Sequence, residues 1–291
     1  MAGRALVLGG GGPVGIAWEI GLSAGLAENG IALAKADRII GTSAGSFVGA
    51  ALASGRTPDS LLKSQIEQGE RDRAARNQAS GERPKPPDLM PLMRMMARRP
   101  QTGEVPRDLL IELGAFALQA KTMPEENFIA SFGGVAKDGT AWPGGYGCTA
   151  VDAESGEFRV WDESSGVALG RAIASSCSVP GIFPPITIKG RRYVDGGMRS
   201  ATNIDLVKGA ERVLALVVES RMTTDAMRQR VREEIAEIER AGGKVETIVP
   251  NGDCVEVFGP NLMDASRRAD VAKAGARQGR AEAERLRGFW S

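Results

Sequence analysis

Gly41-Thr42-Ser43-Ala44-Gly45 follows the short apolar run Ile39-Ile40 and precedes a second apolar run, residues 47–52. A strand, a sharp turn and a helix in this order form a nucleophile elbow, which holds a serine exposed at the turn. Gly41 and Gly45 have no Cβ, so strand and helix can approach closely on both sides. The Ser43 hydroxyl would then lie at a helix N-terminus, where free N–H groups and the helix dipole favour negative charge. Ser43 is therefore our candidate nucleophile.

Chance is the alternative explanation of this pattern, because the sequence contains 38 glycines. The Gly-x-Ser-x-Gly match alone does not separate the two explanations. The apolar run before it and the helical pattern after it favour the elbow.

The sequence contains no histidine. This absence excludes the Ser-His-Asp triad and any metal site that uses histidine ligands. If Ser43 is a nucleophile, another side chain has to serve as its base. We expect no metal ion at the site.

Length and composition favour a globular protein with an ordinary hydrophobic core. The chain has 291 residues, of which 42% are hydrophobic, and we expect a single domain over residues 1–291. Its formal net charge is +1, so nothing in the overall charge indicates a nucleic acid or a strongly acidic partner.

Cysteine usage and the N-terminal sequence favour a cytoplasmic protein. Cys148, Cys177 and Cys254 are odd in number and far apart, which suits reduced core thiols better than disulfides or a metal site. The first apolar run, residues 5–8, is too short for a signal peptide, and no run reaches about 18 apolar residues. We expect a cytoplasmic location, with peripheral contact at the inner membrane as a further option.

The run Ala5-Leu6-Val7-Leu8 leads into the glycine loop of residues 9–15, and a helical pattern follows over residues 16–29. A buried strand, a glycine loop and a helix form the opening unit of an α/β fold. Gly10, Gly12 and Gly15 match the dinucleotide fingerprint Gly-x-Gly-x-x-Gly. That fingerprint needs an acidic residue after the second strand, whereas Asp37 stands before it, so we expect no nucleotide cofactor.

The other interpretation of the glycine loop is an oxyanion site. Glycines leave backbone N–H groups bare, and a tetrahedral acyl intermediate needs two or three such donors. Two successive strand-turn-helix units would bring this loop beside Ser43 at the carboxyl edge of the sheet.

Residues 56–140 have a different character, because no strong β pattern interrupts this stretch. We expect an inserted helical cap there, with a proline-rich break at residues 81–87 and helical patterns at residues 65–78, 106–120 and 124–132. Residues 89–100 carry four methionines and three arginines. Because methionine adapts to irregular apolar partners, this segment could be a lid or a surface that contacts lipid. A helix packed on the core, with solvated arginines, explains it equally well.

The later sequence supplies a carboxylate. Two β-rich runs, residues 146–152 and 157–161, have the spacing of a hairpin, and a helix of small residues follows at 167–176. Then Arg191-Arg192-Tyr193-Val194-Asp195-Gly196-Gly197 ends a short strand on an aspartate followed by two glycines. Asp195 is the obvious replacement base for Ser43, provided that partial burial raises its pKa. Aspartate and glycine together can also simply make a turn.

Taken together, the glycine loop, the Ser43 stretch and Asp195-Gly196-Gly197 resemble the patatin-like phospholipase family, over roughly residues 5–220. The resemblance implies a three-layer α/β/α core with a mostly parallel central sheet and an inserted helical cap. It also implies a Ser-Asp dyad that needs no histidine, metal or other cofactor.

By this resemblance Ser43 matches the nucleophile and Asp195 the base. Four glycines match the oxyanion loop: Gly10, Gly11, Gly12 and Gly15. Four more support the two catalytic turns: Gly41, Gly45, Gly196 and Gly197. The family commonly has a basic residue just before the last glycine of the loop, where this chain has Val14.

We therefore expect a lipid acyl hydrolase of the phospholipase, lysophospholipase or esterase type. Its substrate would be a lipid or another acyl ester, and residues 89–100 are a candidate for peripheral membrane contact. The alternative is a lipid or acyl-chain binding protein that keeps the fold without turnover. The sequence does not distinguish which ester is cleaved.

Overall fold

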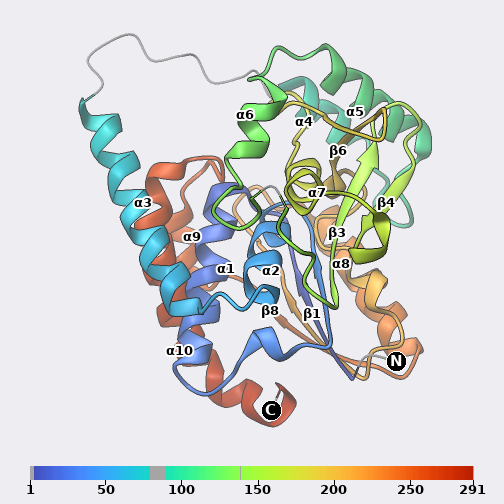
Figure 1. The fold of residues 1–291 in the computed structure, drawn as a ribbon. Coiled ribbons are helices and arrows are strands. Elements are labelled where there is room, and N and C mark those ends of the chain that lie inside the picture. Colours follow the sequence, from blue (N-terminus) through green and yellow to red (C-terminus); the bar gives the residue numbers. More distant parts are fainter. Residues whose placement is uncertain (1–2, 79–89, 138, 291) are drawn as a thin grey trace.

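A mixed sheet forms the centre of the computed structural model, which describes residues 3–78, 90–137 and 139–290 (Figure 1). Within these residues eight strands form one sheet in the order β5-β6-β3-β2-β1-β7-β8, with β4 also paired to β3. The strands are β1 (Arg4–Leu8), β2 (Arg38–Gly41), β3 (Tyr146–Asp152), β4 (Phe158–Trp161), β5 (Ile186–Ile188), β6 (Arg191–Asp195), β7 (Arg212–Leu216) and β8 (Lys244–Ile248). β1, β2, β3, β7 and β8 run parallel, which confirms the mostly parallel sheet.

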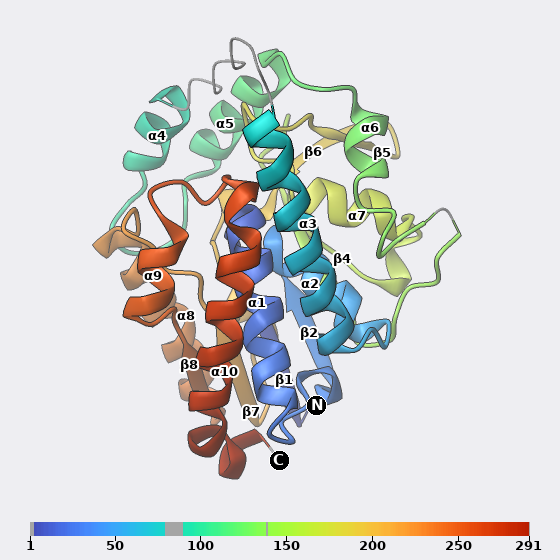
Figure 2. The same ribbon diagram turned by 90° about the vertical axis from the view of Figure 1, so that its left-hand side faces the viewer.

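Helices cover both faces of this sheet (Figures 1 and 2). They are α1 (Gly12–Ala27), α2 (Ala44–Ala53), α3 (Pro58–Gln78), α4 (Met90–Ala97), α5 (Arg107–Gln119), α6 (Glu125–Ala130), α7 (Leu169–Ser176), α8 (Asp225–Arg240), α9 (Gly252–Phe258) and α10 (Arg268–Trp290). Two short 3₁₀ turns, η3 (Gly196–Met198) and η4 (Ile204–Val207), follow β6. The expected three-layer α/β/α architecture is confirmed.

The alternation of side chains along β1 explains the layers. Leu6 and Leu8 belong to the core shared with α1, α2, α7 and α10. Ala5 and Val7 belong to the core on the other face, which includes Ile238 of α8. Because successive side chains of a strand point to opposite faces, a strand that is apolar at every position is buried on both.

The pairing of β3 is the feature that positions the site. Ala150 and Val151 pair with both β4 and β6, so these two strands lie on opposite edges of β3. Cys148 pairs with both β2 and β4, which places β2 on the edge that β6 also uses. β2 runs parallel to β3 and β6 runs antiparallel. The carboxyl ends of β2 and β6 therefore approach each other along one edge of β3.

The helical insert is divided between two places. α3 lies along α1 and α10, where an added Cβ on Gly69 would come within 2.4 Å of the Ala269 nitrogen, and Arg73 pairs with Asp270. The part of the expected cap before residue 79 thus belongs to the outer layer of the core, because its small and charged residues match α10. α4 and α5 instead share a core with Val151 and Val194 of the sheet. The proline-rich break at 81–87 lies outside the described residues.

The first helix begins earlier than its apolar pattern predicted. We expected a loop up to Gly15 and a helix from Ile16, whereas α1 begins at Gly12. Pro13 lies in its first turn, where proline costs no hydrogen bond and its fixed φ suits a helix. Gly12, Val14 and Gly15 are therefore helical residues, and the loop between β1 and α1 is shorter than expected.

Glycines allow α1 and α10 to pack closely, and the two helices are neighbours in both views (Figures 1 and 2). An added Cβ on Gly21 would lie 2.1 Å from the Ala272 carbonyl oxygen, and one on Gly25 would lie 2.2 Å from that of Ala276. Gly279 approaches the Leu22 carbonyl oxygen in the same way. The two backbones are close enough that no side chain larger than hydrogen fits at these positions.

We expect Gly25→Ala to lower the free energy of unfolding by about 1–3 kcal/mol, because the helices would have to move apart. Gly288→Ala is the matched control, since it lies in the same helix pair and no atom comes within 4 Å of its added Cβ. The control should unfold at the same denaturant concentration as the wild type or slightly higher. Equal midpoints for both variants would show that the α1–α10 contact is looser than described.

Candidate active site

Ser43 occupies the strained turn that an elbow requires. Its backbone has φ 53° and ψ −116°, in a region that costs a non-glycine residue on the order of 1–3 kcal/mol. An added Cβ on Gly41 would lie 2.4 Å from the Gly45 carbonyl oxygen, and one on Gly45 would lie 2.1 Å from the Leu8 carbonyl oxygen. Both glycines are therefore needed for α2 to begin directly against β1 and β2.

Side chains from neighbouring elements hold the Ser43 backbone in this conformation. The Ser43 N–H donates to the Ser176 hydroxyl at 3.0 Å, at the end of α7. The Ser43 carbonyl oxygen accepts from the Ser46 hydroxyl at 2.6 Å and from the Cys177 thiol at 3.1 Å. Tyr146 of β3 donates its hydroxyl to the Ser46 carbonyl oxygen at 2.7 Å. The strain at Ser43 is thus offset by hydrogen bonds from α2, α7 and β3.

Asp195 is the last residue of β6 and is directed to the site by the turn that follows. The Gly197 N–H donates to Asp195 Oδ1 at 2.7 Å, which fixes the carboxylate. An added Cβ on Gly196 would lie 2.1 Å from the Thr149 hydroxyl, so only glycine fits there. Asp195 and Ser43 are 2% and 7% exposed, respectively, so both side chains are nearly closed to bulk water.

The electrostatics of Asp195 suit a proton acceptor near neutral pH. Burial raises its pKa from the ordinary 3.8 to about 7, because the charged form loses its water. Hydrogen bonding from the Ser43 hydroxyl and the Gly197 N–H, and the positive charge of Arg99, oppose this rise. The pKa condition set by the sequence analysis is therefore met at this residue.

Fewer glycines of the loop have a free backbone N–H group than the resemblance implied. The Gly10 N–H donates to the Ala201 carbonyl oxygen at 2.8 Å, and the Gly15 N–H donates to Gly11 within the helix at 2.7 Å. Among the described residues no acceptor is found for the N–H groups of Gly11, Gly12 and Ala44. Gly10 and Gly15 are thus not available as oxyanion donors in this structure, because their N–H groups already have partners.

Gly10 and Gly15 still contribute by being small. An added Cβ on Gly10 would lie 3.3 Å from Ser43 Cβ, and one on Gly15 would lie 3.4 Å from Ala44 Cβ. The glycine loop and the elbow are therefore in direct contact, as the two strand-turn-helix units predicted. Val14, at the position where the resemblance led us to expect a basic residue, is buried in the core and donates its N–H to the Leu262 carbonyl oxygen.

Asp37, the acidic residue considered for a nucleotide ribose, lies at the wrong end of the sheet. It directly precedes β2 and its carboxylate accepts from the Arg4 N–H at 2.8 Å, where β1 begins. The glycine loop lies at the opposite end of both strands. Asp37 cannot reach a ligand bound at that loop, so the dinucleotide interpretation loses its acidic residue.

A polar cluster that the sequence did not reveal connects the two catalytic turns. The hydroxyls of Thr42 and Thr149 are 3.0 Å apart, and the Asn203 amide donates to Thr42 at 2.9 Å. These residues come from β2, β3 and the loop before η4, so no local pattern joins them. Arg99, which lies just beyond α4, is a further residue near Asp195 that had no sequence signal of its own.

The described residues contain no group of three or more acidic, cysteine or histidine side chains that could hold a metal ion. Cys148, Cys177 and Cys254 are buried and unpaired, as expected of core thiols. Across the described part of the chain, none of the helices combines the length and the apolar character that crossing a membrane requires.

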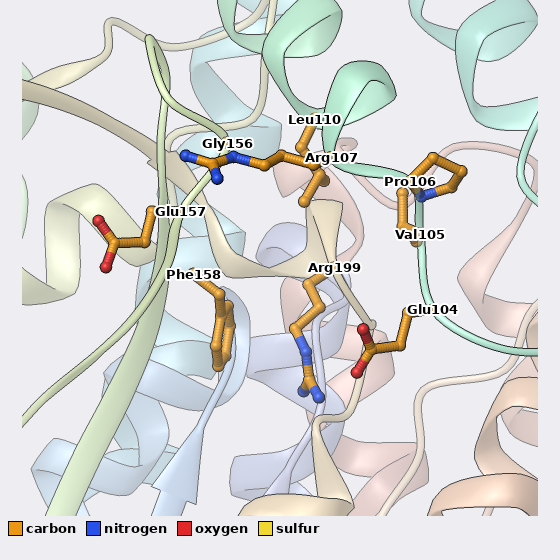
Figure 3. A pocket seen from close by; sticks show the side chains of 9 residues that line it. All are labelled: Glu104, Val105, Pro106, Arg107, Leu110, Gly156, Glu157, Phe158 and Arg199. Atoms are coloured by element: carbon orange, nitrogen blue, oxygen red, sulfur yellow. The ribbon is translucent and has the colours of Figure 1, made fainter.

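A cavity of about 580 Å³ lies between the insert and the core, and neither Ser43 nor Asp195 lines it (Figure 3). Arg107 enters it from the start of α5, and Phe158 and Arg199 lie side by side across it (Figure 3). The Arg199 guanidinium lies 4.6 Å from the centre of the Phe158 ring and pairs with Asp205 at 2.5 Å. Its charge is thus engaged by the protein itself.

Comparison with known proteins supports the resemblance. A family model described as patatin-like phospholipase matches residues 6–208. No curated protein shows a significant sequence match. Among solved structures, VipD from Legionella pneumophila is similar with a TM-score of 0.47 and 14% identity, over 97% of this chain and 66% of VipD. ExoU, in its complex with SpcU from Pseudomonas aeruginosa, gives 0.45 and 18%, over 99% of this chain and 52% of ExoU. The chain thus spans less than two thirds of either protein.

We expect the stability difference between Asp195→Asn and the wild type to depend on pH. With a folded pKa raised above the unfolded value, the wild type has its full stability below about pH 4 and loses it as pH rises through about 7. Asparagine keeps the oxygen that accepts from Gly197 and never ionises. The unfolding free energy of the variant relative to the wild type should rise by about 4 kcal/mol between pH 4 and pH 8. A constant difference in urea titrations at both pH values would contradict the raised pKa.

Proposed function

This chain belongs to the patatin-like phospholipase family, and from that premise we propose that it is a lipid acyl hydrolase in which Ser43 is the nucleophile and Asp195 the base. The family is one of serine-dependent lipid hydrolases, so hydrolysis of an acyl ester is the activity to expect at this level. The assignment of roles to individual residues is the part that is proposed here.

One observation carries this proposal. β6 ends on Asp195, whose pKa is about 7, and this strand end lies beside the strained turn that holds Ser43 after β2. A general base works best when its pKa is near the working pH. The sequence holds no histidine that could take this role. A buried carboxylate that is fixed by Gly197, and whose pKa is lowered by the Ser43 hydroxyl, is the remaining group with the required chemistry.

In the proposed reaction, Ser43 Oγ attacks the carbonyl carbon of the ester while Asp195 accepts the hydroxyl proton. The carbonyl electrons move onto oxygen, and the resulting oxyanion expels the alcohol, which takes the proton from Asp195. A water molecule then attacks the acyl-serine with Asp195 again as base. Collapse of this second intermediate releases the fatty acid and returns the proton to Ser43.

The oxyanion donors that we propose are the N–H groups of Gly11, Gly12 and Ala44. They have no acceptor within the described part of the chain, and they come from the two loops that touch at Gly10 and Ser43. Gly12 and Ala44 are the first residues of α1 and α2, where the helix dipoles favour negative charge. Of the four oxyanion glycines that the resemblance implied, this set retains Gly11 and Gly12 and omits Gly10 and Gly15.

A non-catalytic acyl-chain binding protein is the second candidate. A binding protein would have no use for a strained serine, whose backbone conformation costs stability. It would likewise have no need of a buried aspartate, whose ionisation also costs stability. Both features are instead what a nucleophile and its base require, so we place hydrolysis first.

We further propose that α4 and α5 contact lipid, within a single domain that spans the chain. Six large apolar side chains are more than one third exposed in the described residues, and four of them lie on or near these helices: Met90, Met93, Leu118 and Met123. Figure 2 shows α4 and α5 together at one end of the molecule. Exposed apolar side chains gathered in one region are typical of a surface that meets lipid or another protein.

We expect a fluorophosphonate to add one adduct to the wild type, detected by intact-protein mass. Ser43→Ala should gain none, and Asp195→Asn should react at least about a hundredfold more slowly, since it lacks the base. Ser54→Ala, an exposed serine at the end of the same helix α2, should label like the wild type.

The same enzyme preparation should release fatty acid from at least one member of a panel of phospholipids, lysophospholipids, glycerides and thioesters. A correctly folded wild type that neither labels nor turns over would overturn the hydrolase and bring the binding protein to the front. Labelling that survives in Ser43→Ala would instead reassign the nucleophile.

For the lipid surface, we expect Met90→Ser with Met93→Ser to reduce co-sedimentation with phospholipid vesicles several-fold, because each replacement removes exposed apolar area. Met222→Ser is the matched control, because Met222 is 55% exposed, close to the 56% of Met90, and lies before α8 rather than on α4. Equal loss in the control would mean that binding depends on overall apolarity and not on this surface.

A further inference from the structure

Arg99 reaches from the insert to the turn that carries Asp195. It lies two residues beyond the end of α4, and its guanidinium donates through Nη2 to the carbonyl oxygens of Gly197 and Met198, at 3.0 and 2.5 Å. Gly197 is also the residue whose N–H holds the Asp195 carboxylate. One short turn is thus bound from one side by Asp195 and from the other by Arg99.

The surroundings of Arg99 distinguish it from the arginine beside it. Arg99 Nε is buried and has no hydrogen-bond acceptor within the described residues. Burial lowers the pKa of Arg99 to about 10, which still leaves it charged at neutral pH. Arg98 is exposed and pairs with Glu112 of α5 at 2.6 Å. Taking a cation partly out of water is costly unless its charge is used, whereas Arg98 is an ordinary surface ion pair.

α4 itself is anchored, so the position of Arg99 is defined by packing. Leu92 and Met95 are buried in the core that also contains Leu113 of α5 and Met198 of η3. The same helix that presents Met90 and Met93 to solvent therefore packs its other face against the turn after Asp195. Arg99 extends this contact with hydrogen bonds.

Three side chains face Asp195 from three different elements. The Ser43 hydroxyl comes from the elbow, Cys177 from the end of α7, and Arg99 from the segment after α4. Burial raises the pKa of the Cys177 thiol, so it is neutral at pH 7, and the serine hydroxyl is neutral as well. Arg99 is therefore the group that supplies positive charge to Asp195.

We propose that Arg99 is a positioning residue, which holds the Gly196–Met198 turn and keeps the Asp195 carboxylate ionised enough to act as base. This inference rests on the proposed function, because it assigns Arg99 a role in the Ser43–Asp195 reaction. Without this charge, only the hydrogen bonds from Ser43 and Gly197 would oppose the rise that burial causes in the Asp195 pKa, so a larger fraction of the aspartate would be protonated at neutral pH. The insert thus contributes to the chemistry of the core, and does not only cover it.

The test is the pH dependence of labelling by a neutral fluorophosphonate. The probe carries no charge, so a direct attraction between Arg99 and an anionic substrate cannot contribute. In the wild type, the rate should rise with pH along a limb that reports the pKa of Asp195, near 7. In Arg99→Gln this limb should move up by about one pH unit, which lowers the rate at pH 7 about fivefold and leaves the plateau at high pH nearly unchanged.

Two variants make the result decisive. Arg99→Lys keeps the charge and should restore most of the wild-type limb, even if its shorter contacts lower the melting temperature. Arg98→Gln removes the neighbouring charge and should keep the wild-type limb. If Arg99 were only a structural anchor, Arg99→Gln would lower stability and the plateau but leave the midpoint of the limb where it is, and this result would overturn the inference.

The outcome is also distinct from failure of the proposed function. A wild type that does not label at any pH would remove the dyad itself. A wild type that labels with a limb near pH 7, beside an Arg99→Gln variant with the same limb, would leave the dyad intact and remove only the role of Arg99. Should Arg99→Gln fail to fold, Arg99→Lys still tests the inference, because this variant keeps the positive charge. If the midpoint of its pH limb nevertheless moved up by about one pH unit, the effect would not be due to the charge, and the inference would be overturned.

Discussion

The shared edge of β3 is the constraint on which the site depends. β2 and β6 use the same edge from opposite directions, and their carboxyl ends meet beside Thr149. Because one strand is parallel to β3 and the other antiparallel, two residues far apart in sequence are delivered to one point without any long loop. The glycine at position 196 follows from this arrangement, since the Thr149 side chain already fills the space beside it. The proximity of Ser43 and Asp195 is thus a property of the sheet.

Around this point the protein offsets two local costs with contacts from several elements. The strained backbone of Ser43 is held by side chains from α2 and α7, and Tyr146 of β3 holds the neighbouring Ser46. The buried charge of Asp195 is supported by the Gly197 N–H and by Arg99. Neither cost could be sustained by a turn on its own, since each is comparable to a sizeable fraction of the net stability of a domain. Strain and buried charge are arranged where the chemistry would use them.

The sequence predicted the parts of the fold that leave a local pattern. The apolar run at residues 5–8, the hairpin after residue 146 and the helix of small residues before residue 177 all correspond to elements of the structure. The predicted start of α1 was too late, because the apolar helical pattern begins at Ile16, whereas the helix begins at Gly12 with Pro13 in its first turn. The sequence predicted a single helical cap over residues 56–140, because a helical pattern does not show which element a helix packs against. The packing partner of α3 is α10, which is about 200 residues away in sequence.

Glycine chemistry marks some of the candidate site residues in the sequence, whereas tertiary contacts define others that leave no local pattern. Ser43, Asp195 and their glycines are recognisable because a strained turn restricts which residues fit. Which N–H groups of the glycine loop remain free depends on Ala201, a residue far away in sequence, so the choice of Gly11 and Gly12 over Gly10 could not be read from the loop. Arg99 could not be distinguished from Arg98, because only the packing of α4 decides which of the two adjacent arginines is partly buried against the core.

The glycine contact between α1 and α10 also has a consequence in time. α1 carries the glycine loop at its start, yet its partner helix is synthesised about 240 residues later, which takes on the order of 10–50 s at ribosomal rates. During that interval α10 is not yet available to pack against the glycine face of α1. Native contacts of such long sequence separation slow folding, because the loop must close before the contact is gained. The growing chain therefore completes the layer behind the glycine loop only after α10 has been synthesised.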